Sequence, residues 1–63
     1  MYYVQYSFDG VFKTVASFPN IDKALYFIKY NNVVYDIDIN LVQICHRGMV
    51  ITLNDNTLKK IFK

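Results

Sequence analysis

Only two glycines occur in the 63 residues, and each lies between two segments in which apolar and polar residues alternate. Gly10 follows Asp9, and Asp-Gly is among the strongest hairpin signals because both central residues of a type I′ turn have positive φ. A two-residue turn at this point pairs Phe8 with Val11. Continuing the same register pairs Val4 with Val15 and predicts an antiparallel hairpin over residues 2–17.

The alternation assigns the residues of this hairpin to two faces. The more apolar face is expected to lie on the core and carries Tyr2, Val4, Tyr6 and Phe8. Tyr3 and Phe12 fall on the other face, so we expect both rings to point away from the core.

A second hairpin is predicted over residues 42–53, around Arg47 and Gly48. A two-residue turn here gives the pairs Ile44 with Ile51, Cys45 with Val50, His46 with Met49, Gln43 with Thr52 and Val42 with Leu53. Arginine is unfavourable at a position of positive φ. A longer loop is therefore the alternative at this turn.

The segment between the hairpins has the spacing of an amphipathic helix. Its buried stripe is expected to contain Ile21, Ala24, Leu25 and Ile28. Asn20 is suited to the N-cap, and Asn31-Asn32 is expected to end the helix because asparagine tolerates the left-handed conformation found there. Tyr26 and Tyr30 are four residues apart and fall on the far side of the helix.

Asp36, Asp38 and Asn40 occupy alternate positions, as at the start of a calcium loop of the EF-hand type. That loop needs glycine at its sixth position and glutamate at its twelfth, where this chain has Leu41 and Arg47. We therefore interpret the three residues as the solvated face of a β-strand; a weaker divalent site on the two aspartates is a less favoured alternative. The apolar alternation changes phase between Leu41 and Val42, which indicates a bulge or a break between two strands.

Together these elements predict an α+β fold of the order ββαββ, with one helix packed across an antiparallel sheet and residues 1–63 forming a single small domain. Leu58, Ile61 and Phe62 have helical spacing. A short C-terminal helical turn is therefore predicted to cover an edge of the sheet.

The composition gives little support to catalysis. Cys45 and His46 are neighbours on a predicted strand, so their side chains point to opposite faces and cannot act as a nucleophile and its base. The chain has no second cysteine or histidine, no glutamate and no glycine-rich phosphate loop. We expect neither enzymatic activity nor a metal or other cofactor.

The compartment is suggested by the same composition. A single cysteine excludes an intrachain disulfide and favours a reducing environment. The N-terminal residues lack the basic and apolar regions of a signal peptide, and no apolar run is long enough to span a bilayer. A cytoplasmic protein is expected, in the host cytoplasm if the source is viral.

Six tyrosines and five phenylalanines are more aromatic residues than so small a core requires. We expect a small non-catalytic protein-binding module, in the form of a viral or mobile-element inhibitor that occludes a host or defence enzyme, as a monomer or a homodimer. The expected partner-binding residues are Tyr3, Phe12, Tyr26 and Tyr30, with Asp36 and Asp38 as an acidic patch for a basic groove. The alternative is a small nucleic-acid-binding regulator using the sheet aromatics and Lys13, Arg47, Lys59, Lys60 and Lys63.

Overall fold

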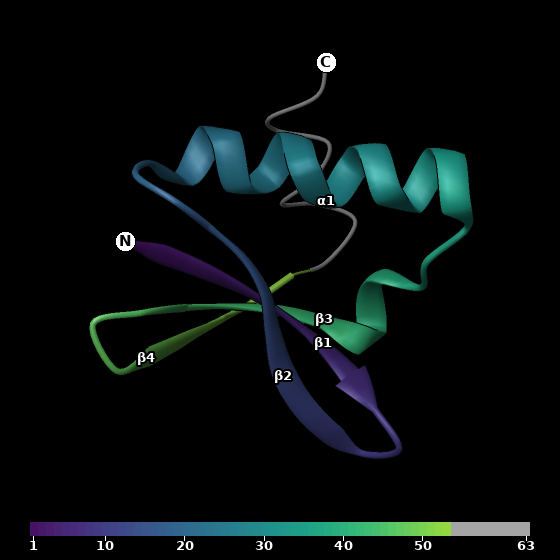
Figure 1. Cartoon of the computed structure of the whole chain (residues 1–63), viewed down its shortest axis with the longest axis horizontal. Helices are drawn as coiled ribbons and strands as arrows, with labels where there is room; N and C mark the ends of the chain where they lie inside the picture. Colours follow the sequence, from purple (N-terminus) through teal and green to yellow (C-terminus); the bar gives the residue numbers. More distant parts are fainter. Residues whose placement is uncertain (54–63) are drawn as a thin grey trace.

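The computed structural model describes residues 1–53 and has the predicted α+β arrangement of the order ββαββ. Its elements are β1 (Tyr2–Phe8), β2 (Val11–Phe18), α1 (Ile21–Tyr35), the 3-10 helix η1 (Ile39–Leu41), β3 (Val42–His46) and β4 (Met49–Thr52). Figure 1 shows α1 lying along one side of the sheet. The predicted C-terminal helical turn lies outside the described residues.

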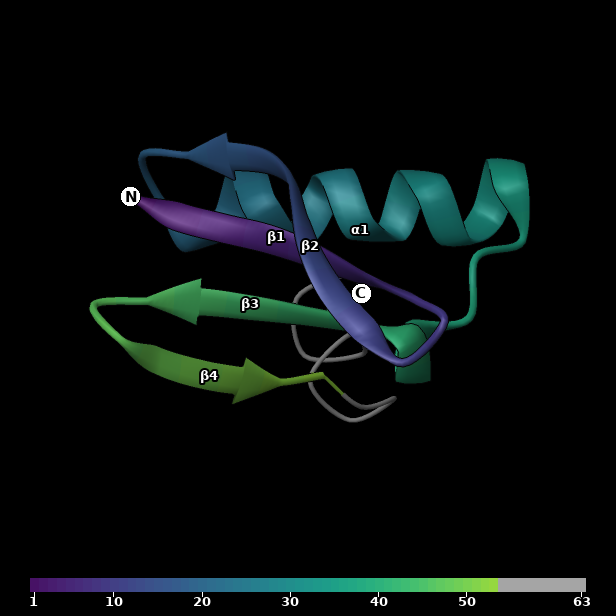
Figure 2. The same cartoon turned by 60° about the horizontal axis from the view of Figure 1, so that its bottom comes forward.

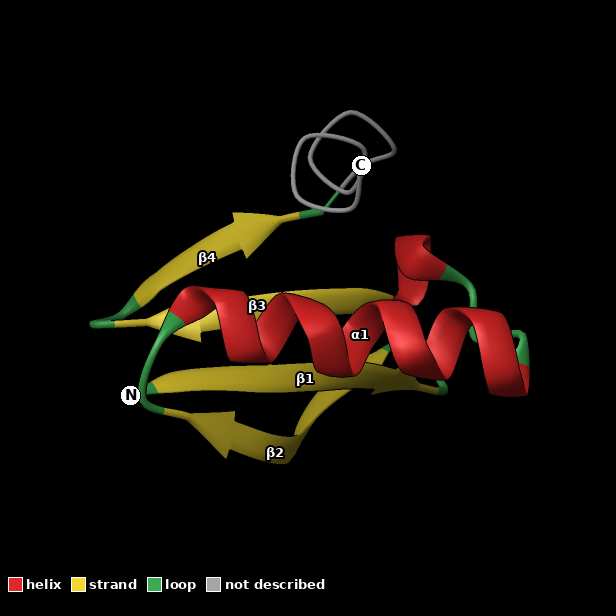
Figure 3. Ribbon diagram, turned by 90° about the horizontal axis from the view of Figure 1, so that it is seen from above, coloured by secondary structure: helices red, strands yellow, loops and turns green. Residues whose placement is uncertain are grey.

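The four strands form one antiparallel sheet in the order β2-β1-β3-β4. The first strand of each hairpin is central, and β1 pairs with β3 from Tyr3↔Cys45 to Tyr6↔Val42. Among the described elements, α1 covers one face of this sheet, as the views in Figures 2 and 3 show.

Both hairpins turn in two residues that have positive φ. The angles are 53° at Asp9 and 83° at Gly10, and 53° at Arg47 and 76° at Gly48. Both turns therefore have the φ signs of type I′, whose twist matches that of the flanking strands. The short turn is confirmed at Arg47, and the longer loop considered from the sequence is not formed.

The register of the second hairpin is confirmed for four of its five predicted pairs, since β4 ends at Thr52 and Leu53 does not pair with Val42, whereas the register of the first is partly wrong. From the turn to Gln5↔Thr14 the first hairpin pairs as predicted, but Val4 then pairs with Ala16. Val15 is the extra residue of a β-bulge. Because of this shift Ala16 and Phe18 pack against the core, and Val15 is 42% exposed.

Helix α1 begins where predicted, because the Asn20 side chain accepts a hydrogen bond from the Lys23 amide at 3.0 Å. Its predicted end is wrong. Asn31 donates its side-chain amide to the Phe27 carbonyl at 2.7 Å, and the helix continues to Tyr35. The left-handed residue that ends the helix is Asp36, with φ 56°.

The predicted strand face of Asp36, Asp38 and Asn40 is not formed. Asp36 caps the C-terminus of α1, and Asp38 caps η1 by accepting a hydrogen bond from the Asn40 amide at 2.9 Å. The change of phase in the sequence marks the start of β3 at Val42. At Asp38 the cause is the competition of its side chain for a backbone amide, which favours turns and caps over strands, and at Asp36 it is the left-handed backbone conformation.

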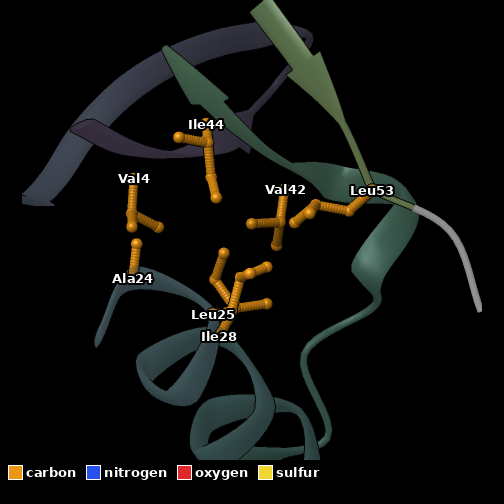
Figure 4. Packing of buried hydrophobic residues seen from close by; sticks show 7 residues of the cluster. All are labelled: Val4, Ala24, Leu25, Ile28, Val42, Ile44 and Leu53. Atoms are coloured by element: carbon orange, nitrogen blue, oxygen red, sulfur yellow. The ribbon is translucent and has the colours of Figure 1, made fainter. Parts of the chain in front are cut away.

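The core lies between α1 and the sheet (Figure 4) and consists of Val4, Ala24, Leu25, Ile28, Val42, Ile44 and Leu53. Tyr2, Tyr6, Phe18 and Phe27 pack around it. Phe8 does not join the core as expected and is 49% exposed. It stands next to the hairpin turn and beyond the part of β1 that pairs with β3.

Candidate interaction surfaces

The face of the sheet opposite α1 is one of two surfaces that the described elements leave uncovered. We call it the open sheet face and define it by the pairing register as Tyr3, Gln5, Ser7, Phe12, Thr14, Ser17, Gln43, Cys45, Val50 and Thr52. None of these ten strand positions holds Asp, Glu, Lys, Arg or His. Tyr3 and Phe12 are 43% and 39% exposed, in agreement with the expectation that both rings point away from the core.

A row of polar side chains crosses the open sheet face from edge to edge. Gln5 donates its amide to the Thr14 hydroxyl at 3.2 Å, and Gln43 donates its amide to the Gln5 side-chain oxygen at 2.7 Å. Thr52 is opposite Gln43 in the register and completes the row. The hydrogen bonds link three neighbouring strands and hold the amide groups in fixed orientations.

The two aromatic rings of this face lie on either side of the polar row. Phe12 is opposite Ser7, and Ser7 is four positions from Tyr3 along β1. At about 3.3 Å per residue that separation is roughly 13 Å. The face therefore presents two aromatic positions with a hydrogen-bonding row between them.

The second uncovered surface is the outer side of α1. Tyr26, Tyr30, Val33 and Val34 lie there at helical spacing and are 63%, 58%, 70% and 53% exposed. We call these four residues the outer stripe. With Lys29 they line a shallow groove of about 310 Å³.

The sequence predicts only half of this stripe. Tyr26 and Tyr30 face outward as predicted, whereas Val33 and Val34 lie beyond the helix end predicted at Asn31-Asn32. The signal was present in the sequence, since Val33 and Val34 follow Tyr30 at i+3 and i+4.

The predicted partner-binding residues are thus divided over separate parts of the molecule. Tyr3 and Phe12 belong to the open sheet face, whereas Tyr26 and Tyr30 belong to α1, on the other side of the sheet. Asp36 and Asp38 are exposed at and just beyond the C-terminus of α1. They lie off the open sheet face and do not form a joint acidic strand face.

Cys45 and His46 have structural neighbours in this fold. The His46 ring stacks on Tyr2 with a centroid distance of 3.8 Å, and its Nδ1–H donates to the Met1 carbonyl at 2.9 Å. Cys45 is half-buried on the open sheet face between Tyr3 and Val50. Within residues 1–53 no cluster of three or more His, Cys, Asp or Glu side chains could hold a metal ion.

Among the basic residues of the described part, none lies on the open sheet face, and Lys29 lines the groove of the outer stripe. Lys13 lies on β2, Lys23 and Lys29 lie on α1, and Arg47 lies in the second turn. Lys59, Lys60 and Lys63 lie outside the described residues.

Over the described residues, the helix α1 falls short of the length and apolarity required to cross a membrane.

Comparisons with known proteins found no relative of this chain. No family model, curated protein or solved structure matches the chain.

Proposed function

We propose that the protein is a small non-catalytic protein-binding module that docks a partner protein on its open sheet face. The observation that carries the proposal is a face of the four-stranded sheet that the described elements leave uncovered, with two exposed aromatic rings and no charged side chain among its strand positions. The cores of protein–protein interfaces are likewise rich in aromatic residues and poor in charged ones.

The polar row lowers the free-energy cost of docking a partner. A polar group that loses water without gaining a partner weakens binding, and ordering a flexible side chain also costs free energy. The Gln5 amide already bonds to Thr14, and the Gln43 amide bonds to Gln5. A partner that covers the row therefore meets amides that are oriented and partly satisfied, with Tyr3 and Phe12 as anchors on either side.

The same face is poorly suited to nucleic acid. Proteins bind single strands with stacking aromatics combined with lysines or arginines that neutralise phosphates. Lys13 pairs with Tyr6, so it lies on the other side of the sheet from Phe12. Protein recognition is the better supported function, and occlusion of a host or defence enzyme is the form in which we propose it acts.

The test compares how well the protein captures a partner when residues on one or the other face of the sheet are replaced. Wild-type protein, Tyr3→Ala, Phe12→Ala and Lys13→Ala are immobilised and exposed to an extract of the cells that express the protein. Lys13→Ala is the matched control, because residue 13 neighbours Phe12 on β2 and lies on the opposite face. We expect a protein captured by the wild type and by Lys13→Ala to be lost with Tyr3→Ala and Phe12→Ala.

Two outcomes would contradict the proposal. In one, Tyr3→Ala and Phe12→Ala retain the captured protein as well as the wild type does. In the other, the four proteins bind labelled single-stranded oligonucleotides in fluorescence anisotropy with a steep salt dependence that Lys13→Ala reduces. That dependence would indicate phosphate neutralisation and would support the nucleic-acid alternative.

A further inference from the structure

Helix α1 is apolar on two opposite sides, which is unusual for a helix that packs on one sheet. Ala24, Leu25 and Ile28 are buried on the sheet side, and the outer stripe lies on the far side. A surface helix ordinarily carries charged and polar residues on the side away from its core, and a helix that is apolar all round is buried. The outer side of α1 thus has the composition of a covered surface.

The two ends of the helix carry charges that an antiparallel neighbour would compensate. Lys23 lies near the N-terminus, where the helix dipole disfavours a cation, beside Asp22, whose negative charge the dipole favours. Asp36 caps the C-terminus, where the dipole disfavours an anion, and the last turn has no basic residue. A second helix running in the opposite direction would bring a lysine to each Asp36.

We infer that the outer stripe is the interface of a homodimer, in which α1 packs antiparallel against α1 of a second copy. A two-fold axis midway between Lys29 and Tyr30 brings Tyr26, Tyr30 and Val33 of the stripe and both charged ends together in one register. Tyr26 then lies opposite Val33 of the second copy, and Lys23 lies opposite Asp36. Lys29 lies opposite Tyr30, where an ammonium group beside an aromatic ring is favourable.

This arrangement gives four layers, with the two helices in the middle and a sheet on each outer side. Both open sheet faces stay uncovered in the dimer, so the inference is independent of the proposed function. The contact is made mainly by one helix of 15 residues from each copy. Such an interface is at the lower end of the range for specific complexes, and we expect a dissociation constant in the micromolar range.

Sedimentation velocity of the full chain from about 1 to 500 μM, the range that brackets this expected dissociation constant, tests the inference. We expect a monomer–dimer equilibrium for the wild type. Tyr30→Lys should weaken it by at least about tenfold, because a lysine at the two-fold axis faces Lys29 of the other copy. Val11→Lys is the matched control, since Val11 is 58% exposed on β2, and it should leave the equilibrium unchanged.

The register is tested by cysteine cross-linking in a Cys45→Ser background. Tyr26→Cys and Val33→Cys proteins should form a disulfide when mixed under mild oxidation, and either protein alone should cross-link much less. Self-cross-linking of Tyr26→Cys alone as efficient as that of the mixture would indicate a parallel pair and overturn the antiparallel register. A wild type that stays monomeric at every concentration, or a Tyr30→Lys protein that dimerises as tightly as the wild type, would overturn the inference.

Discussion

Replacing Val4 or Val15 by alanine makes the same chemical change at two positions that the bulge in β2 treats differently. In an unbulged hairpin the two residues would pair and share the core. In the structure Val4 pairs with Ala16 and is 0% exposed, whereas Val15 is 42% exposed. Comparing the stability lost in the two variants therefore tests which residue of β2 faces the core.

The expected costs follow from these exposed fractions. Valine to alanine removes two carbon groups worth about 0.8 kcal/mol each when fully buried. For Val4 that transfer cost of about 1.6 kcal/mol grows to roughly 2–3 kcal/mol, because a cavity remains in the core. For Val15 just over half of the transfer cost applies and no closed cavity forms, so about 1 kcal/mol or less is lost.

Urea unfolding followed by far-UV circular dichroism measures both values. A chain of 63 residues is expected to have a free energy of unfolding of about 3–9 kcal/mol, so the two variants are distinguishable. The slope of the free energy against urea should be the same in both. A Val15→Ala variant that loses as much stability as Val4→Ala would refute the bulge and place Val15 in the core.

Three further predictions concern the N-cap, the second turn and Tyr6. Asn20→Ala should lower the free energy of unfolding by about 1 kcal/mol, because the Lys23 amide loses its acceptor; Asn20→Asp should retain most of the stability, and equal losses in urea unfolding would contradict the cap. Arg47→Asn should raise the free energy of unfolding by roughly 0.5–1 kcal/mol, since Arg47 has φ 53° and asparagine tolerates that conformation better; no rise in the urea midpoint would count against a two-residue turn. Tyr6→Phe should raise stability by about 0.5–1 kcal/mol, because the buried Tyr6 hydroxyl has no hydrogen-bond partner among the described residues. Burial raises the pKa of Tyr6 above 10.0, so the unfolded chain ionises first and stability should fall as pH rises above that value; Tyr6→Phe should show less of this fall in urea unfolding at pH 9 to 11.

The features predicted correctly from the sequence are those determined by local chemistry. Asp9-Gly10 and Arg47-Gly48 specify their turns through positive φ, and the turn then sets the register of the strands next to it. The N-cap at Asn20 is equally local. Each prediction needed only residues close to one another in the chain.

The features that were missed depend on contacts that a pattern does not show. Val15 and Ala16 are both apolar, so alternation alone cannot tell which of them faces the core. Asn31 suits a helix end by its residue type, yet its side chain bonds to the Phe27 carbonyl and is tolerated inside the helix. Asp36 has the same tolerance for the left-handed conformation and ends the helix instead.

The candidate surfaces were predictable residue by residue but not as assemblies. Alternation placed Tyr3 and Phe12 off the core, and helical spacing did the same for Tyr26 and Tyr30. Their division between the open sheet face and α1 requires the packing of the helix on the sheet. The same helical spacing correctly predicts Ala24, Leu25 and Ile28 as the covered side of α1.

The two uncovered surfaces differ in a way that makes their proposed roles separable. The outer stripe offers apolar side chains with charges at the ends of the helix, whereas the open sheet face offers an uncharged polar row between aromatic rings. The sheet itself lies between them, and substitutions at distant sites without shared contacts have nearly additive effects. Tyr30→Lys should therefore weaken self-association and leave the intrinsic affinity of each open sheet face for its partner intact. Phe12→Ala should weaken partner binding and leave self-association unchanged, because nothing in the contact between the two helices depends on side chains of the open sheet face.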